Sequence, residues 1–100
     1  MGAKIVNHAE GRFALEGEMN FTSVPVLHEQ SRGLFAGVSR LEFDLGGVTR
    51  SDSAALSLML EWQRDAQRNG QQIHFNNVPE QLRVIARLYG IDKDLPITDE

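Results

Sequence analysis

The sequence predicts a single α/β domain over residues 1–100, with a four-stranded mixed sheet and helices mainly on one face. Two alternating apolar segments on either side of Glu10-Gly11 predict an antiparallel hairpin. Two further strand patterns each follow a helical pattern, which gives the order β-β-α-β-α-β-α and predicts parallel crossovers. Because the strands alternate rather than run apolar throughout, the second face of the sheet is expected to be wet or to meet a partner.

The four predicted strands are short and each places its apolar side chains on one side. In the second strand, Phe13 and Leu15 share a face, and in the third Leu41, Phe43 and Leu45 do so. Gly46-Gly47 is expected to end the third strand. The predicted strands cover residues 4–8, 12–16, 40–45 and 72–76.

Three helices are predicted from capping residues and apolar spacing. Thr22 or Ser23 is expected to cap the first helix, and the longest helix is expected to run from residues 51–53 to Asn69-Gly70. The last helix is expected to open at residues 77–79 and to end at Tyr89-Gly90. Its predicted core face consists of Val78, Leu82, Ile85, Ala86 and Tyr89.

Composition excludes several classes of function. The net charge of −4 gives no electrostatic case for binding nucleic acid. The absence of cysteine rules out disulfides and thiolate metal sites and fits the cytoplasm. Neither a secretory signal pattern nor an apolar run long enough to cross a bilayer is present, so direct membrane insertion is not expected.

No set of side chains converges on a catalytic pattern. His8, His28 and His74 stand apart in the sequence and are expected to be solvated, and Glu16 and Glu18 are expected to solvate a strand face. No glycine-rich phosphate loop or nucleophile elbow is present. We therefore predict no catalytic residue, no metal ligand and no cofactor, and the protein is not expected to be an enzyme.

The segment of residues 45–60 holds the most informative motif, a strand followed by a loop and the pair Asp52-Ser53 at the start of the longest helix. In one interpretation Ser51 or Asp52 simply caps the helix. In the other, Ser53 presents its hydroxyl at the positive end of the helix, where a phosphate or a partner carboxylate is favoured. The residues alone leave both interpretations open.

An interface is also predicted beside this motif. The apolar arc of the longest helix is wider than one core stripe requires, so either the helix is deeply buried or Leu56 and Leu60 form an apolar margin that meets another protein. On the last helix, Val84 and Leu88 lie off the core face beside Arg83 and Arg87. The predicted partner-binding residues are Asp52, Ser53, Ala54, Leu56, Leu60, Val84 and Leu88.

These motifs resemble the STAS family, the fold of sulfate-transporter and anti-sigma-factor-antagonist domains. Asp52-Ser53 matches the start of the family's D-S-[ST]-G phosphoacceptor pattern, whereas Ala54 and Ala55 depart from it. The segment F-A-L-E-G-E-M at residues 13–19 is similar to the family's second strand. L-M-L at residues 58–60 and I-A-R-L-Y-G-I at residues 85–91 resemble the MlaB-like branch of the family.

The resemblance implies a non-catalytic subunit that stabilises or regulates the cytoplasmic MlaF-like ATPase of a phospholipid-transporting ABC complex. It implies contact with the membrane permease only through that ATPase, and hence a cytoplasmic protein peripheral to the inner membrane of a Gram-negative bacterium. It also implies an alternative, an anti-sigma-factor antagonist that is switched by phosphorylation at Ser53.

Overall fold

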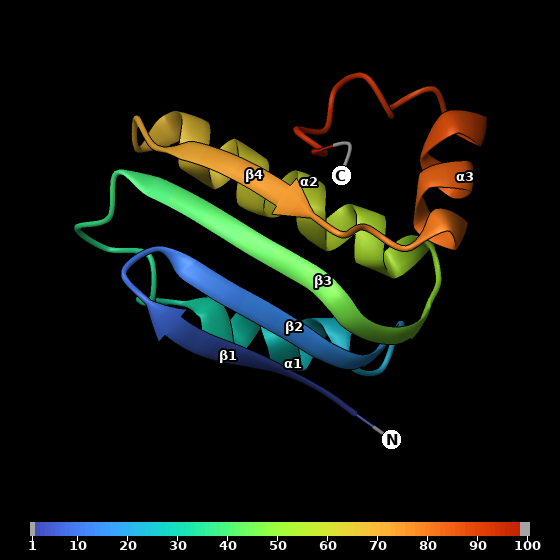
Figure 1. Ribbon diagram of the computed structural model, residues 1–100, viewed down its shortest axis with the longest axis horizontal. Helices are drawn as coiled ribbons and strands as arrows, with labels where there is room; N and C mark the ends of the chain where they lie inside the picture. Colours follow the sequence, from blue (N-terminus) through green and yellow to red (C-terminus); the bar gives the residue numbers. More distant parts are fainter. Residues whose placement is uncertain (1, 99–100) are drawn as a thin grey trace.

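The computed structural model describes residues 2–98 and contains one four-stranded sheet with three helices. Strand β1 pairs antiparallel with β2, and β2, β3 and β4 are mutually parallel neighbours (Figure 1). The predicted mixed sheet and element order are confirmed. The elements are β1 (Ala3–Ala9), β2 (Arg12–Met19), α1 (Val24–Ser31), β3 (Arg40–Ser51), α2 (Ser53–Arg68), β4 (Gln72–Asn76) and α3 (Glu80–Leu88).

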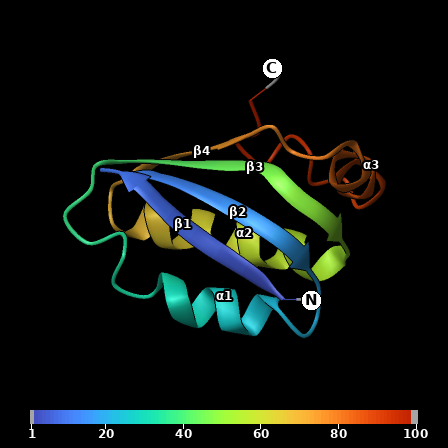
Figure 2. The same cartoon turned by 60° about the horizontal axis from the view of Figure 1, so that its bottom comes forward.

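The helices lie mainly on one face of the sheet, as predicted. Figure 2 shows α1 and α2 together beneath the strands, whereas α3 lies beyond one end of the sheet. The opposite face carries no helix in either view (Figures 1 and 2). Among residues 2–98, no helix has the length and apolar character needed to cross a membrane.

An aromatic stack between the sheet and α2 forms the centre of the core. Phe43 on β3 lies parallel to Trp62 on α2, with ring centroids 4.5 Å apart, and Phe75 on β4 stacks beside Phe43 at 5.5 Å. Phe43 and Phe75 are fully buried, as predicted from the strand alternation. The indole Nε1 of Trp62 donates a hydrogen bond of 3.0 Å to Ser31 Oγ, which joins α2 to α1 inside the core.

Strand β3 continues six residues beyond its predicted end at Leu45, so the expectation that Gly46-Gly47 breaks it was wrong. The pairing with β2 shifts register there, from Ala14 opposite Asp44 to Glu16 opposite Gly47. A Cβ added at Gly47 would lie 3.1 Å from the Leu15 carbonyl oxygen. The glycines therefore permit an irregularity in a continuous strand, because backbones approach closely at this point. Because β3 ends at Ser51, only Asp52 separates it from the start of α2 at Ser53.

Helix α3 contributes less to the core than its spacing predicted. Leu82 and Ala86 are fully buried, but Ile85 is only half-buried and Tyr89 is 63% exposed. The expectation that Tyr89 belongs to the core face was therefore wrong. Because α3 is nine residues long and lies beyond the end of the sheet, it meets the core along a narrow stripe only.

The segment after α3 returns to the sheet and pairs with the outer edge of β4. Phe75 donates its backbone N–H to the Pro96 carbonyl at 2.9 Å, and Thr98 donates its N–H to the Phe75 carbonyl at 2.8 Å. Leu95 is buried just before this pairing. The chain thus covers the outer edge of β4 at Phe75.

Candidate partner-binding site at the start of the second helix

The three parallel strands end at the same edge of the sheet, and the chain leaves each of them there to enter a helix. Figure 1 shows the β2–α1 loop, the β3–α2 connection and the start of α3 following one another along this end of the molecule. Strand carboxyl ends and helix amino ends meet at such an edge, and ligands and partners of α/β proteins are commonly bound there. Asp52 and Ser53 follow β3, the middle one of these three strands.

Asp52 is the N-cap of α2, which decides between the capping alternatives left open by the sequence. Its Oδ1 accepts a hydrogen bond from the Ala54 N–H at 2.9 Å, and its carbonyl accepts from the Ala55 N–H at 3.0 Å. Its own N–H donates to the Met19 carbonyl at 3.1 Å. The first turn of α2 is therefore fixed both to its cap and to the end of β2.

Ser53 is the first residue of α2, and its side chain is half-buried. Because Asp52 performs the capping, the Ser53 hydroxyl has no hydrogen bond to any of residues 2–98. It lies at the positive end of a 16-residue helix, where an acceptor or anionic group is favoured electrostatically. The hydroxyl is thus available both to a partner and to chemical modification.

The apolar margin predicted on α2 for contact with a partner is largely buried inside the domain. Leu56 is 2% exposed and Ala54 is 7% exposed, so both pack into the domain rather than towards a partner. The wide apolar arc exists because the sheet on one side and α1 and α3 on the others all contact this helix. Leu60 remains half-buried. The expectation that Leu56 contacts a partner is corrected, and Ala54 can contribute only its backbone.

Val84 and Leu88 lie on the outside of α3, as predicted. Val84 is 39% exposed and Leu88 is 78% exposed, and their spacing of four residues places them on one face of the helix. Arg87 beside them forms an ion pair with Glu80, with 3.2 Å between Nη2 and Oε2. This face offers exposed apolar area with charged side chains at its border, which is a composition found at protein interfaces.

Phe21 is a surface aromatic for which the sequence pattern predicted neither a core nor a site role. It lies in the β2–α1 loop, two residues beyond Met19, and 75% of it is exposed. Met19 pairs with Ser51 across the sheet, so Phe21 and Ser53 each lie two residues beyond a paired position on adjacent strands. Phe21 therefore belongs to the same edge as Ser53.

The loop that carries Phe21 is held by a compact set of hydrogen bonds. Asn20 Oδ1 accepts from the backbone N–H groups of Thr22 and Ser23, each at 3.0 Å. Ser23 Oγ accepts from the Asn20 N–H at 2.9 Å and donates to the Glu18 carbonyl. Ser23 is the N-cap residue of α1, one of the two candidates expected from the sequence, but its side chain bonds within the loop and makes no capping hydrogen bond to the helix. The Asn20 turn three residues before Ser23 was the sequence feature that could have drawn attention to Phe21.

The face of the sheet that no helix covers is polar, and an ion pair there offsets the charge of Glu42. Arg40 Nε donates to Glu42 Oε2 at 2.9 Å. This bond, opposed by partial burial and assisted by Asn76 and Arg12, holds the pKa of Glu42 below its ordinary value of 4.5. The exposed apolar side chains Phe21, Val84 and Leu88 lie elsewhere, on the loop after β2 and on α3.

Solved structures of known proteins share this fold. The anti-sigma factor antagonist SpoIIAA in its unphosphorylated form superposes with a TM-score of 0.68 at 16% identity, covering 96% of this chain and 86% of that chain. The Bacillus cell fate determinant SpoIIAA in its phosphorylated form superposes with a TM-score of 0.70 at 16% identity, covering 96% and 88%. A structure of Mglu matches at a TM-score of 0.59 and 22% identity over 77% of this chain, which corresponds to 19% of that chain. At such low identities these likenesses establish the fold.

The sequence itself matches a family model along nearly its whole length. That model describes the family as "Mlab, STAS domain", and the match runs from residue 6 to residue 98. It spans β2, the Asp52-Ser53 motif and α3 together, so the sequence motifs and the fold belong to one continuous unit. The chain therefore belongs to the MlaB-type STAS domain family.

Proposed function

We propose that this protein is the non-catalytic STAS subunit of a phospholipid-transporting ABC complex, and that it binds and stabilises the cytoplasmic ATPase of that complex. The observation that carries the proposal is the match to the MlaB-type family over residues 6–98. The edge around Ser53 supports it, because exposed apolar side chains and a free hydroxyl suit a protein partner better than a small substrate.

In this proposal the partner covers the strand-end edge from the β2–α1 loop to α3. Ser53 contributes its unmodified hydroxyl at the centre, and Phe21 and Leu88 contribute apolar anchors on either side. Phe21 and Leu88 each have only two side-chain torsions, so fixing them in an interface costs little conformational entropy relative to the apolar area they bury. The revised partner-binding set is Phe21, Asp52, Ser53, Leu60, Val84 and Leu88.

The ATPase would hold the protein at the cytoplasmic side of the inner membrane, next to the permease. No insertion of the STAS domain into lipid is required, since the ATPase supplies the link to the membrane. The protein's own contribution would be to stabilise or regulate the ATPase, with nucleotide hydrolysis carried out by the partner.

A second function, that of an anti-sigma-factor antagonist, is favoured by one specific observation. Ser53 occupies the position that resembles the family's phosphoacceptor, and its hydroxyl is free of hydrogen bonds to residues 2–98. Against it, Ala55 stands where the phosphoacceptor pattern has glycine, and it is fully buried. The backbone beside Ser53 is therefore packed in place and less able to adapt to a kinase.

Co-purification from native membranes tests the proposed function. The protein is isolated in mild detergent, and the chains that accompany it are identified by mass spectrometry. We expect an ABC-type ATPase and a membrane permease in stable proportion. Recovery of a serine kinase with a sigma-factor regulator, and no ATPase, would replace the proposal with the second function. A Leu88→Glu variant of the same chain serves as the control, because it should recover less ATPase at equal expression.

A further inference from the structure

His28, Glu61 and Asp65 come together between α1 and α2, although they are distant in the sequence. His28 lies on α1, whereas Glu61 and Asp65 are four residues apart on α2 and so share one face of it. One ligand atom from each side chain lies within 4.8 Å of the others, and all three residues are half-buried. The sequence pattern predicted a solvated histidine at position 28, because the two carboxylates approach it only in the folded chain.

The imidazole of His28 lies close to the two carboxylates but is not bonded to either of them. Within residues 2–98, the imidazole of His28 forms no hydrogen bond or ion pair, although one oxygen of Glu61 and one of Asp65 lie within 4.8 Å of one of its nitrogens. Direct contact would require a nitrogen-to-oxygen distance of about 3 Å. Ligand atoms bound to one tetrahedral zinc ion lie about 3.4 Å apart, since each bond is about 2.1 Å long. A modest rotation of these flexible side chains would reach that spacing.

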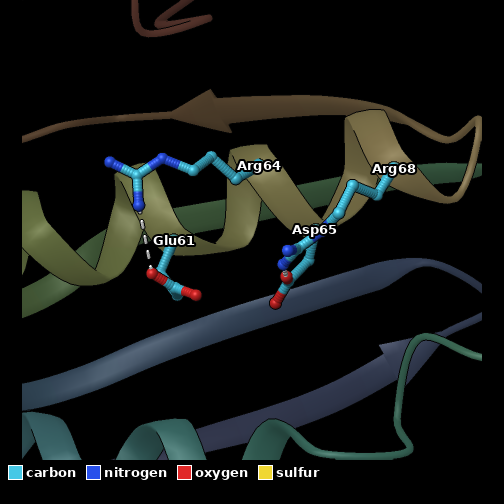
Figure 3. A network of polar contacts seen from close by, with 4 residues as sticks. All are labelled: Glu61, Arg64, Asp65 and Arg68. Carbon is cyan, nitrogen blue, oxygen red and sulfur yellow. Dashed lines mark hydrogen bonds and ion pairs between the residues drawn. The ribbon is translucent and has the colours of Figure 1, made fainter.

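Each of the two carboxylates is also paired with an arginine. Figure 3 shows Arg64 bonded to Glu61 and Arg68 bonded to Asp65, each from the next turn of α2. Both arginine side chains are about two-thirds exposed, at 67% and 68%. Exposed pairs of this kind are weak and screened by salt. They orient the two carboxylates, and each pair can yield one carboxylate oxygen to a cation.

We propose that His28, Glu61 and Asp65 form a zinc-binding site that joins α1 to α2. A neutral imidazole nitrogen with two carboxylate oxygens is a donor set that suits Zn²⁺, whereas Mg²⁺ and Ca²⁺ prefer oxygen ligands alone. Three protein ligands leave a fourth position for water. The site is independent of the proposed function, because α2 carries it two turns or more beyond Ser53.

Bound zinc would add a second link between the two helices. A buried hydrogen bond from Trp62 to Ser31 already links them; Trp62 directly follows Glu61, and Ser31 lies three residues after His28. The ion would therefore reinforce α1, an eight-residue helix that has no side-chain N-cap bond of its own. A ligand that binds only the folded state raises its stability.

Calorimetric titration of the metal-free protein with zinc chloride tests the site. We expect one Zn²⁺ per chain, with affinity lowered at least about tenfold in His28→Ala, because loss of even an outer partner of a metal ligand costs that much. Glu61→Gln, which keeps the size of the side chain, should weaken binding in the same direction. His8→Ala, on the exposed edge of β1, is the matched control and should bind as wild type does. The proposal is overturned if wild type shows no saturable binding, or if His8→Ala loses binding and His28→Ala keeps it.

Fluorescence of Trp62, the only tryptophan in the sequence, locates the ion. Co²⁺ can stand in for zinc and quenches a nearby indole, so a saturating loss of emission that zinc reverses is expected in wild type. The same quenching in His28→Ala would place the cation elsewhere and would contradict the site. Each variant's melting temperature without metal shows that it remains folded during the comparison.

Discussion

The backbone N–H of Asp52 donates a hydrogen bond of 3.1 Å to the carbonyl of Met19, so the start of α2 is bonded directly to the end of β2. Ser53 directly follows Asp52, and Phe21 lies two residues beyond Met19, so both residues lie near this bond. Neither loop can move without breaking this bond or the Asn20–Ser23 turn. The proposed interface is thus organised before a partner arrives, which lowers the entropic cost of binding.

A negative charge at Ser53 should disrupt partner binding more than loss of the hydroxyl does. The helix terminus favours an anion, but an apolar interface would have to desolvate it, and Asp52 next to it adds repulsion. We expect Ser53→Glu to weaken ATPase affinity more strongly than Ser53→Ala, with both melting temperatures close to wild type. Affinity is measured by titration with the purified ATPase.

Gln67→Glu provides the control for added charge on the same helix, because Gln67 is exposed at the far end of α2. It should bind as wild type does. Tighter binding of Ser53→Glu would instead support a phosphorylation switch. If both Ser53 variants bind the ATPase as tightly as wild type does, Ser53 is only the first residue of the helix. The interface would then be expected at Val84 and Leu88.

Phe21→Ala should weaken partner binding without unfolding the domain. Burial of a phenylalanine side chain contributes about 2 kcal/mol, which corresponds to about a thirtyfold change in Kd. Because Phe21 is 75% exposed in the free protein, its removal should leave the free energy of unfolding almost unchanged. Val26→Ala removes apolar area that is 51% exposed on α1 and should bind normally. Unaltered affinity in Phe21→Ala would remove the loop from the interface.

Phe43→Ala should destabilise the fold by about 3–5 kcal/mol, because it leaves a cavity in the core. Phe43 is fully buried between Trp62 and the neighbouring strand phenylalanines, so no side chain can refill the space without leaving the stack. In a domain with a total stability of about 5–15 kcal/mol the variant will be marginal. Urea unfolding measures the loss, with Phe21→Ala as the exposed-aromatic control. A midpoint within error of wild type would contradict the stacked core.

Arg40→Gln should reduce the dependence of stability on acid pH. Arg40 lowers the pKa of Glu42 below 4.5 in the folded state, so the pair stabilises the protein above the unfolded value and loses this effect as pH falls through the folded value. Wild type and variant should therefore differ at neutral pH and converge in acid. Urea unfolding at both pH values measures this. Arg32→Gln, which breaks an exposed pair with Glu29, should change little at either pH. A constant difference at both pH values would assign the effect to packing instead.

The sequence was sufficient for the elements whose pattern is set by local chemistry. Alternation identified Phe43 and Phe75 as buried, and the Asp52 cap and Asn69-Gly70 stop bounded α2 closely. Patterns that depend on neighbours in space were misjudged. Gly46-Gly47 breaks a strand in most contexts, but here it relieves a close approach to β2.

Predictions of burial were wrong for the same reason on α2 and α3. Leu56 is buried because α2 has neighbours on several sides, and Tyr89 is exposed because α3 ends beyond the sheet. Neither fact has a counterpart in the spacing of apolar residues. The grouping of Phe21 with Ser53 and that of His28 with Glu61 likewise depend on how the strands and helices are placed.

The pairing of Pro96 and Thr98 with Phe75 bears on how the protein behaves at high concentration. An open strand edge is a template for another chain, and here the edge of β4 is blocked at Phe75 by the protein's own backbone. The opposite edge, β1, carries a register irregularity near Ala9 and a lysine at position 4, both of which discourage strand addition. A variant shortened before Pro96 would keep most of its core but would have an unpaired edge at β4. A loss of solubility on truncation would therefore indicate self-association through that edge and not misfolding.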